Sequence, residues 1–224
     1  MDSAIQAQPP AAEPPTPTVS EPGLREPGLR EPGLRERKKA ATRQALHEAA
    51  VRLSIDHGPD RITVEAVADA AGVSRRTFSN YFANKEEALL YGDHVRMRLL
   101  LDAVHARPVT ERPWEALTRS ADDFYARLGE RDPHWVAQSR LVRTHPPLLA
   151  RQVATFAALE RELAAEVARR MTGPDPSGMR ARLTAAAFMA GLRVAVHVWL
   201  DRSPGTPLSV LVQQALADIG ERFD

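Results

Sequence analysis

The stretch Thr63–Leu89, TVEAVADAAGVSRRTFSNYFANKEEAL, decides the fold of this 224-residue chain. Its pattern predicts one short helix, a sharp turn at Gly72, and further helices that begin after Ser74 and after Asn84. Glycine suits the turn because it adopts a positive φ without a Cβ clash. Short helices joined by such a turn form a helix-turn-helix, a motif that enters the DNA major groove. The stretch therefore predicts DNA binding.

Apolar residues in this stretch recur at helical spacing. One face of the first helix is predicted to pack inward through positions i, i+3, i+4 and i+7, which are Val64, Val67, Ala68 and Ala71. Phe78 and Phe82, four residues apart, are expected to anchor the next helix to the core. That packing turns toward solvent a polar set that is able to bind base edges and phosphates. The set consists of Arg75, Arg76, Thr77, Ser79 and Asn80.

The helix starts carry capping signals. Ser74 is placed to accept a hydrogen bond from the backbone N–H near Thr77. Asn84 followed by Glu87 matches a capping box. Lys85 lies between them, in a first turn where the helix dipole favours anions instead. An external phosphate is the partner that this position predicts.

From Arg43 to Leu89 the chain resembles the DNA-binding domain of the TetR family of transcriptional regulators. The resemblance rests on an ordered series of segments: RQALHEAAVRL, Gly58, ITVEAVA, AGVS, TF and YFANKEEAL. The family usually has an aromatic residue where Ser79 stands, so Ser79 offers only a shorter hydroxyl contact, while Tyr81 matches the second aromatic. The candidate DNA-binding residues are Arg43, Thr63, Ser74, Arg75, Arg76, Thr77, Ser79, Asn80, Tyr81 and Lys85.

The net charge of +1 does not indicate nucleic acid, but the distribution of charge does. Basic residues are crowded just before and inside the predicted first helix, with Glu36 as the only acid among Arg35, Arg37, Lys38, Lys39 and Arg43. Either a phosphate-contacting arm or a solvated basic tail accounts for this run. The chain has no cysteine, no apolar signal-peptide core and no uninterrupted apolar run of membrane length, so we expect a cytoplasmic protein.

Residues 1–34 form a separate Pro-rich region that ends in three EPGLR repeats from Glu21 to Arg35. Repeated Pro-Gly pairs sustain neither helix nor sheet, so we expect a disordered or polyproline-like arm. It either lengthens the basic arm or is a repeat expansion without function. The predicted domains are this arm, a DNA-binding domain at 35–84, and an effector-binding and dimerisation domain at 85–224.

Beyond residue 84 the pattern is helical, which makes the predicted fold all-α. Expected helices are 85–105, 113–129, 132–143, 147–171, 178–202 and 207–222. The run from Ala185 to Leu200 is apolar around most of its circumference, and the last helix carries an apolar stripe. Both fit the core of a monomer. The TetR resemblance implies instead that they pair with their copies across a two-fold axis in a homodimer.

Aromatic and other side chains on the central helices are either plain core or the lining of an effector pocket, which the resemblance implies. The candidates are Trp114, Phe124, Trp135, Arg140, Phe156, Met189 and His197. Residues 140–152 and the apolar run are similar to a branch of the family that includes the mycofactocin-locus regulator. That similarity implies a lipophilic effector, for which an acyl-CoA is one candidate.

No sequence motif supports an enzyme. The histidines have no metal-binding spacing, and no nucleophile, Walker or dinucleotide motif is present, so we expect no catalytic residue, metal or cofactor. The sequence favours a transcriptional repressor. It is expected to bind a pseudo-palindromic double-stranded DNA operator and to dissociate from it when a small molecule binds. The alternative is an architectural DNA-binding protein that responds to no ligand.

Overall fold

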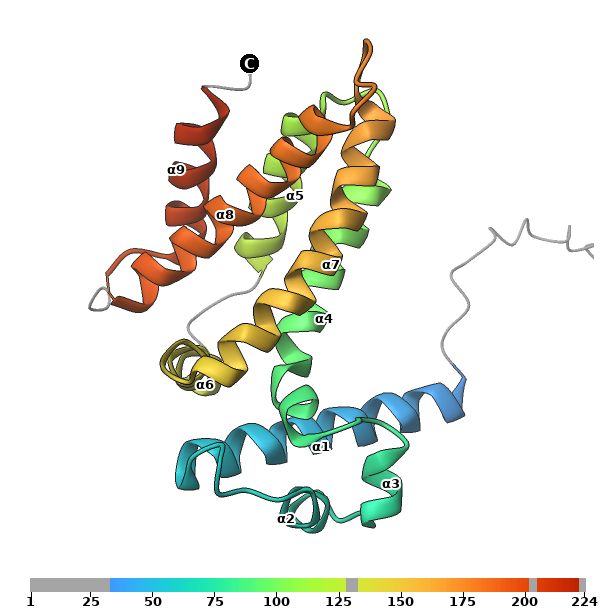
Figure 1. Cartoon of the computed structure of the whole chain (residues 1–224), viewed down its shortest axis with the longest axis vertical. Coiled ribbons are helices and arrows are strands. Elements are labelled where there is room, and N and C mark those ends of the chain that lie inside the picture. The colour runs from blue at the N-terminus through green and yellow to red at the C-terminus, as the bar shows by residue number, and fades with distance from the viewer. Residues whose placement is uncertain (1–32, 128–132, 202–204, 222–224) are drawn as a thin grey trace, which may run out of the picture.

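The computed structural model of the chain describes residues 33–127, 133–201 and 205–221. All regular structure in these ranges is helical, as the sequence predicts, and it forms nine helices (Figure 1). The order is α1 (Leu34–His57), α2 (Val64–Ala70), α3 (Arg75–Ser79), α4 (Lys85–Ala106), α5 (Pro113–Arg127), α6 (Pro133–Thr144), α7 (Pro146–Arg170), α8 (Met179–Asp201) and α9 (Leu208–Gly220). The predicted helix bounds beyond residue 84 that fall on described residues agree with these to within two residues, and the predicted ends at 129, 132, 202 and 222 lie outside the described residues. The repeat-containing arm, up to residue 32, lies outside the described residues.

Helices α1, α2 and α3 and the start of α4 form a small unit at one end of the molecule, here called the reader (Figure 1). Its core is a cluster of buried residues that includes Leu46, Val67, Phe78 and Phe82. The cluster also contains Leu148 of α7. The reader is therefore packed directly on the helices that follow it in sequence.

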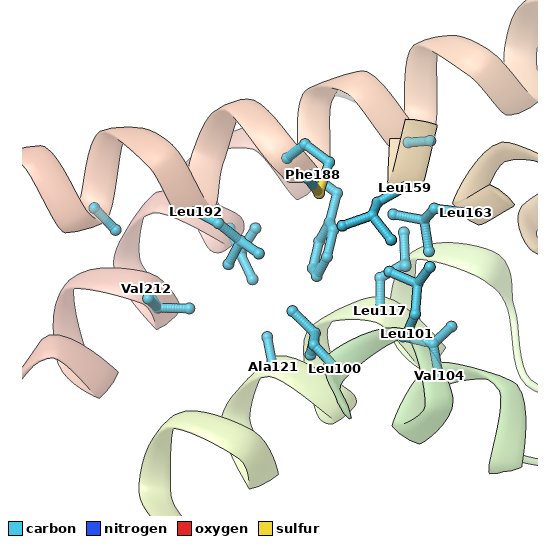
Figure 2. Packing of buried hydrophobic residues seen from close by; sticks show 14 of the residues in the cluster. Leu100, Leu101, Val104, Leu117, Ala121, Leu159, Leu163, Phe188, Leu192 and Val212 are labelled. Atoms are coloured by element: carbon cyan, nitrogen blue, oxygen red, sulfur yellow. The ribbon is translucent and has the colours of Figure 1, made fainter. Parts of the chain in front are cut away.

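Helices α4 to α9 form the larger unit, here called the regulatory domain, and α4 belongs to both because it runs from the reader along α7 (Figure 1). Phe188 of α8 is fully buried and points into the space between α8, α7, α5 and α4 (Figure 2). Leu100 of α4, Leu117 of α5 and Leu163 of α7 surround that space and are also fully buried. Burial of such side chains is the dominant favourable term in folding.

Helix α8 is long and apolar enough to cross a membrane by length and composition. In the folded chain it packs against α7 and α9, and half of its most apolar window is buried. Its buried residues include Ala185, Phe188, Leu192 and Trp199, which belong to the regulatory core. Helix α8 is therefore a core helix of the regulatory domain.

Candidate DNA-reading surface and effector cavity

The turn between α2 and α3 is built by the residues that the sequence singles out. The Thr63 hydroxyl oxygen accepts a hydrogen bond from the Ala66 N–H at 3.1 Å, which caps α2. The Ser74 hydroxyl oxygen accepts one from the Thr77 N–H at 3.1 Å, which caps α3 as predicted. Gly72 has a φ of 69°, a conformation that side chains with a Cβ rarely adopt. Thr63 and Ser74 thus define where the two helices begin, and Gly72 allows the sharp turn between them.

Helix α3 is shorter than the predicted anchor pair implies, because it ends at Ser79 and Phe82 lies beyond it. The backbone N–H of Phe82 still donates to the Phe78 carbonyl at 3.0 Å, so the chain keeps a last turn that brings both rings inward. Their exposed fractions are 1% for Phe78 and 3% for Phe82. The expected anchoring is confirmed, although the second anchor is not part of the regular helix.

The polar face of α3 points to solvent. Arg75 is exposed and forms an ion pair with Glu65 of α2 at 3.0 Å. The Ser79 hydroxyl donates to the Arg75 carbonyl at 3.3 Å, within its own helix. Arg76 and Asn80 are exposed, and no ion pair holds Arg76 within the described part of the chain. Arg76 is thus the α3 cation with the greatest freedom to meet an external anion.

Arg43 lies differently from the other candidates for DNA contact. Its guanidinium carbon is 5.7 Å from the ring centre of Tyr81, 5.9 Å from that of Phe82 and 5.6 Å from that of Tyr91. Contacts of this kind attract a cation to the ring faces. The Arg43 Nε atom is buried and has no hydrogen-bond partner. Arg43 therefore joins α1 to the aromatic residues of the reader, and its guanidinium packs against the ring of Tyr81.

Lys85 has an internal partner that the sequence did not reveal. Its Nζ atom donates to the carbonyl of Ile62 at 2.8 Å and to that of Asp60 at 3.4 Å. The ammonium therefore fastens the loop between α1 and α2 to the start of α4. Half of the predicted capping box forms beside it: Asn84 Oδ1 accepts from the Glu87 N–H at 2.9 Å, whereas the Glu87 carboxylate accepts from the Ala83 N–H at 2.8 Å and not from that of Asn84.

The basic run that the sequence places just before and inside the first helix lies within α1, which already begins at Leu34. All residues from 34 to 41 are exposed, and in Figure 1 this end of α1 extends past the rest of the reader. The exposed cations on it are Arg35, Arg37, Lys38 and Lys39. The basic segment is consequently a helix of defined direction.

The regulatory domain encloses a cavity of about 210 Å³ between α4, α5, α6, α7 and α8. Most of the predicted pocket residues meet there. Phe124, Trp135, Phe156, Met189 and His197 all line the cavity.

Two predicted pocket residues lie elsewhere. Trp114 packs edge-to-face on Phe188, with ring centres 6.3 Å apart, and its indole lies against Gly220 at the end of α9. Arg140 donates to the backbone carbonyl of Leu200 at 3.2 Å. Neither side chain lines the cavity. Helical spacing on α5 and α6 does not reveal which face of each helix meets the cavity. For this reason the sequence alone predicts Trp114 and Arg140 as pocket residues.

The cavity contains a polar network that sequence reasoning missed. Asp93 of α4 is buried, and its Oδ1 atom accepts hydrogen bonds from Trp135 Nε1 at 3.3 Å and from an Arg96 guanidinium nitrogen at 3.2 Å. Its Oδ2 atom accepts from Gln152 Nε2 at 2.7 Å. The network joins α4, α6 and α7. No local sequence motif predicts this network, because the helices that it joins are far apart in sequence.

Two further cavity residues have shifted pKa values. Burial raises the pKa of Tyr125 well above its ordinary value, so the phenol stays protonated at neutral pH. Burial, reinforced by Arg143 and Arg193, lowers the pKa of His197, which keeps the imidazole neutral. Arg143 is itself paired with Asp201 at 2.6 Å. The polar groups of the cavity are thus neutral or paired, except for Arg193 and Glu160 at its exposed or half-exposed rim.

No group of three or more histidine, aspartate or glutamate side chains in the described ranges is arranged to hold a metal ion. The residues that line the cavity offer aromatic surface and hydrogen-bonding groups.

A capped helix-turn-helix with a polar face, joined by a long helix to an all-helical domain with a cavity, defines a class of DNA-binding transcription regulators. A family model for bacterial regulatory proteins of the tetR family matches residues 46–91, and one for the MftR C-terminal domain matches residues 111–224. The chain belongs to the TetR family of transcriptional regulators, as the sequence analysis predicts.

Relatives with known names agree with this membership. The chain is 33% identical over 188 residues to the HTH-type transcriptional regulator TcmR of Streptomyces glaucescens, which covers 80% of this chain and 83% of the relative. It is 25% identical over 192 residues to MftR of Mycobacterium tuberculosis, named as a mycofactocin biosynthesis transcriptional regulator, covering 84% and 94%. A solved TetR-family regulator from Streptomyces coelicolor shares the fold, with a TM-score of 0.56, 18% identity, and coverage of 87% and 98%.

Proposed function

We propose that the protein is a homodimeric repressor that binds a pseudo-palindromic DNA operator and releases it when a small lipophilic molecule occupies the cavity. One observation carries this proposal: the helices that line the cavity also complete the core of the reader. The cavity-lining helices α4, α6 and α7 contribute Leu89, Val142 and Leu148 to the reader cluster. A ligand that displaces these helices must therefore disturb the reader.

On the DNA side, α3 acts as the recognition helix. Its N-terminal residues Arg75, Arg76 and Thr77 lie where helix-turn-helix proteins meet base edges. Ser79, Asn80 and Tyr81 follow at the end of the helix and are suited to phosphate contacts. The exposed basic turns of α1 add contacts to the phosphate backbone, which contribute affinity without sequence preference. Arg43, Thr63, Ser74 and Lys85 support this surface through the internal contacts described above.

A dimer is required to place two readers on one operator. The outer face of α8 offers the surface for it. Leu183 and Val194 are 55% and 52% exposed, and Ala187 and Ala190 lie between them at helical spacing. On α9 the side chain of Val210 is 46% exposed. Burial of this apolar surface against a second copy stabilises the pair.

Coupling between cavity and reader runs through contacts that cross between the two. Gln138 Nε2 of α6 donates to the Leu89 carbonyl of α4 at 2.8 Å. His145, between α6 and α7, contacts the Asp60 carboxylate in the loop after α1 at 3.1 Å. His47 of α1 bonds through Nδ1 to the Ala88 carbonyl of α4 at 2.8 Å. Together they hold the reader in one orientation relative to α4, α6 and α7.

A ligand changes DNA affinity only if it binds one orientation of the reader better than another. The Asp93 network supplies such a difference, because Trp135 and Gln152 reach it from α6 and α7. A molecule that separates these side chains shifts α6 and α7 relative to α4. The readers of the two subunits then no longer match the spacing of two half-sites.

The size of the cavity bears on the effector. An apolar cavity of about 150 Å³ accommodates benzene, and the present cavity measures about 210 Å³. In this conformation it suits a compact ring compound. A long acyl-CoA, the candidate from the sequence analysis, requires the cavity to enlarge by separating the same helices.

The proposal is tested by measuring operator affinity with and without compounds that bind the protein. The operator is first mapped by footprinting of the intergenic DNA beside the gene. An effector that weakens operator binding tenfold, about 1.4 kcal/mol of coupling, must itself bind the operator complex tenfold less tightly. If compounds bind in the cavity and none changes DNA affinity, the protein is instead a ligand-independent architectural DNA-binding protein.

A further inference from the structure

The Tyr125 hydroxyl, on the cavity wall, has no hydrogen-bond partner among the described residues. Tyr125 lies on α5 and is among the residues that line the cavity. Its neighbour Phe124 packs edge-to-face on it, with ring centres 5.1 Å apart, which fixes the plane of the phenol ring. No residue in the described part of the chain exchanges a hydrogen bond with its hydroxyl. The Tyr125 side chain is only partly buried and its hydroxyl is accessible from the cavity, so it is able to bond a molecule there.

The neighbouring polar groups are occupied but incompletely saturated. Asp93 receives three hydrogen bonds from Trp135, Arg96 and Gln152. An ionised carboxylate offers about four acceptor positions, so one remains for a further donor. Arg96 is stacked on the Trp135 ring at 5.0 Å and is paired with Asp93, which leaves this side of the cavity without net charge.

The phenol of Tyr125 and the Asp93 carboxylate both line the cavity, from α5 and α4. Asp93 and Arg96 shift the pKa of Tyr125 in opposite directions, and burial of the phenol outweighs both. The hydroxyl therefore stays protonated. It is able to donate one hydrogen bond and to accept another.

We propose that Tyr125 and Asp93 form a hydroxyl-binding subsite, so that the effector is a compact, uncharged ring compound with a hydroxyl group. The ligand hydroxyl donates to the Asp93 carboxylate and accepts from the Tyr125 hydroxyl, while the ring lies among Phe124, Trp135 and Phe156. This assignment rests on the proposed effector-binding function of the cavity. A charged ligand is disfavoured, because its charge has no unpaired counterion on this side of the cavity.

The subsite is tested with two probes of similar size, 2-naphthol and 2-methylnaphthalene, titrated calorimetrically into the purified full-length chain without DNA. A site that hydrogen-bonds a hydroxyl strongly rejects an analogue that lacks it. We expect 2-naphthol to bind at least tenfold more tightly than 2-methylnaphthalene. In Tyr125→Phe we expect this preference to fall to about threefold or less, with the affinity for 2-methylnaphthalene nearly unchanged.

Tyr91→Phe is the matched control, because Tyr91 packs in the reader and lies outside the cavity lining. It removes one tyrosine hydroxyl and should leave both affinities unchanged. The wild-type comparison of the two probes needs no variant, so it stands even if Tyr125→Phe fails to fold. Equal wild-type affinities overturn the subsite and leave the cavity proposal intact, as does an undiminished preference in a folded Tyr125→Phe. If neither probe binds, the subsite is overturned, whereas the cavity proposal is decided by its own test of operator affinity.

Discussion

The reader and the regulatory domain are stabilised by contacts of different range. In the reader, the hydrogen bonds that shape the helix-turn-helix join residues three positions apart, as in the caps by Thr63 and Ser74. In the regulatory domain, the Asp93 network joins residues 42 and 59 positions apart. Local contacts set the shape of the helix-turn-helix, whereas the contacts between helices of the regulatory domain are the ones that we propose a ligand rearranges. This difference supports the proposal that one region recognises DNA and the other responds to a ligand.

The largest expected effect comes from breaking the assembly of the regulatory domain while leaving the reader alone. Ala190→Glu places a charge on the outer face of α8, in the proposed dimer surface. An unpaired charge buried in such an interface costs about 3–5 kcal/mol. We expect the variant to sediment as a monomer and to lose operator binding.

Ala126→Glu, on an exposed position of α5, is the control for this substitution and should remain a dimer. If Ala190→Glu sediments as a dimer with normal operator affinity, the two copies associate through another surface. Circular dichroism distinguishes a folded monomer from an unfolded chain. An unfolded chain would place Ala190 in the core of the protomer.

Within the reader, we expect different residues to contribute sequence-specific binding and non-specific binding to the phosphate backbone. Arg76→Ala removes the exposed cation of α3 and is expected to cost about 1–3 kcal/mol on the operator if the guanidinium pairs with a guanine. Lys38→Ala, on the exposed end of α1, should weaken operator and random DNA alike and reduce the salt slope by about one. Fluorescence anisotropy on both DNAs at several salt concentrations measures the two effects. An equal loss on both DNAs for Arg76→Ala reassigns that residue to phosphate.

Asp93→Asn should weaken communication between the two regions, measured at an effector concentration that saturates the variant. Hydrogen bonds to a charged group contribute about 1.5–3 kcal/mol and neutral ones about 1 kcal/mol, so the tie between α4, α6 and α7 becomes weaker. We expect the ratio of operator affinities with and without effector to fall severalfold. Gln214→Asn, on the exposed face of α9, serves as a control that should leave the ratio unchanged. An unaltered ratio in Asp93→Asn would remove the network from the coupling path.

The smallest expected effect is a pH dependence at the junction of the two regions. Burial lowers the pKa of His47 below its ordinary value of 6.5, and the positive charge of Arg96 lowers it further. The Ala88 carbonyl, Asp93 and Glu48 raise this pKa, but they do not outweigh burial. The folded state therefore binds this proton less readily than the unfolded state, so His47 lowers stability as the pH falls through 6.5 toward the folded pKa. Urea unfolding at pH 7.5 and 5.5 should show a smaller loss of stability in His47→Gln than in the wild type. An identical loss in both proteins would assign the dependence to other groups.

The range of the contacts also explains which features were predictable. The helix-turn-helix and its family are predictable from the sequence, because the features that define them depend on residues close together in the chain. These features are the caps at Thr63 and Ser74, the turn at Gly72 and the anchor Phe78. The aromatic cavity residues were found by type, because large apolar side chains on central helices meet in the interior. Asp93 and Tyr125 were not found, since their roles depend on the rotation of helices whose contacts are distant in sequence. The position of Lys85 in its own helix predicts an external phosphate as its partner, whereas its carbonyl partners lie 23 and 25 positions away.

The central claim is that cavity and reader share helices, so that occupancy of the cavity changes DNA affinity. The most direct measurement is a closed cycle: operator affinity with and without a saturating cavity ligand, and ligand affinity with and without saturating operator. The account predicts that both ratios are equal and at least tenfold. A ligand whose binding is abolished by Phe156→Ala in a folded protein, and which nevertheless leaves the operator affinity unchanged, would contradict it.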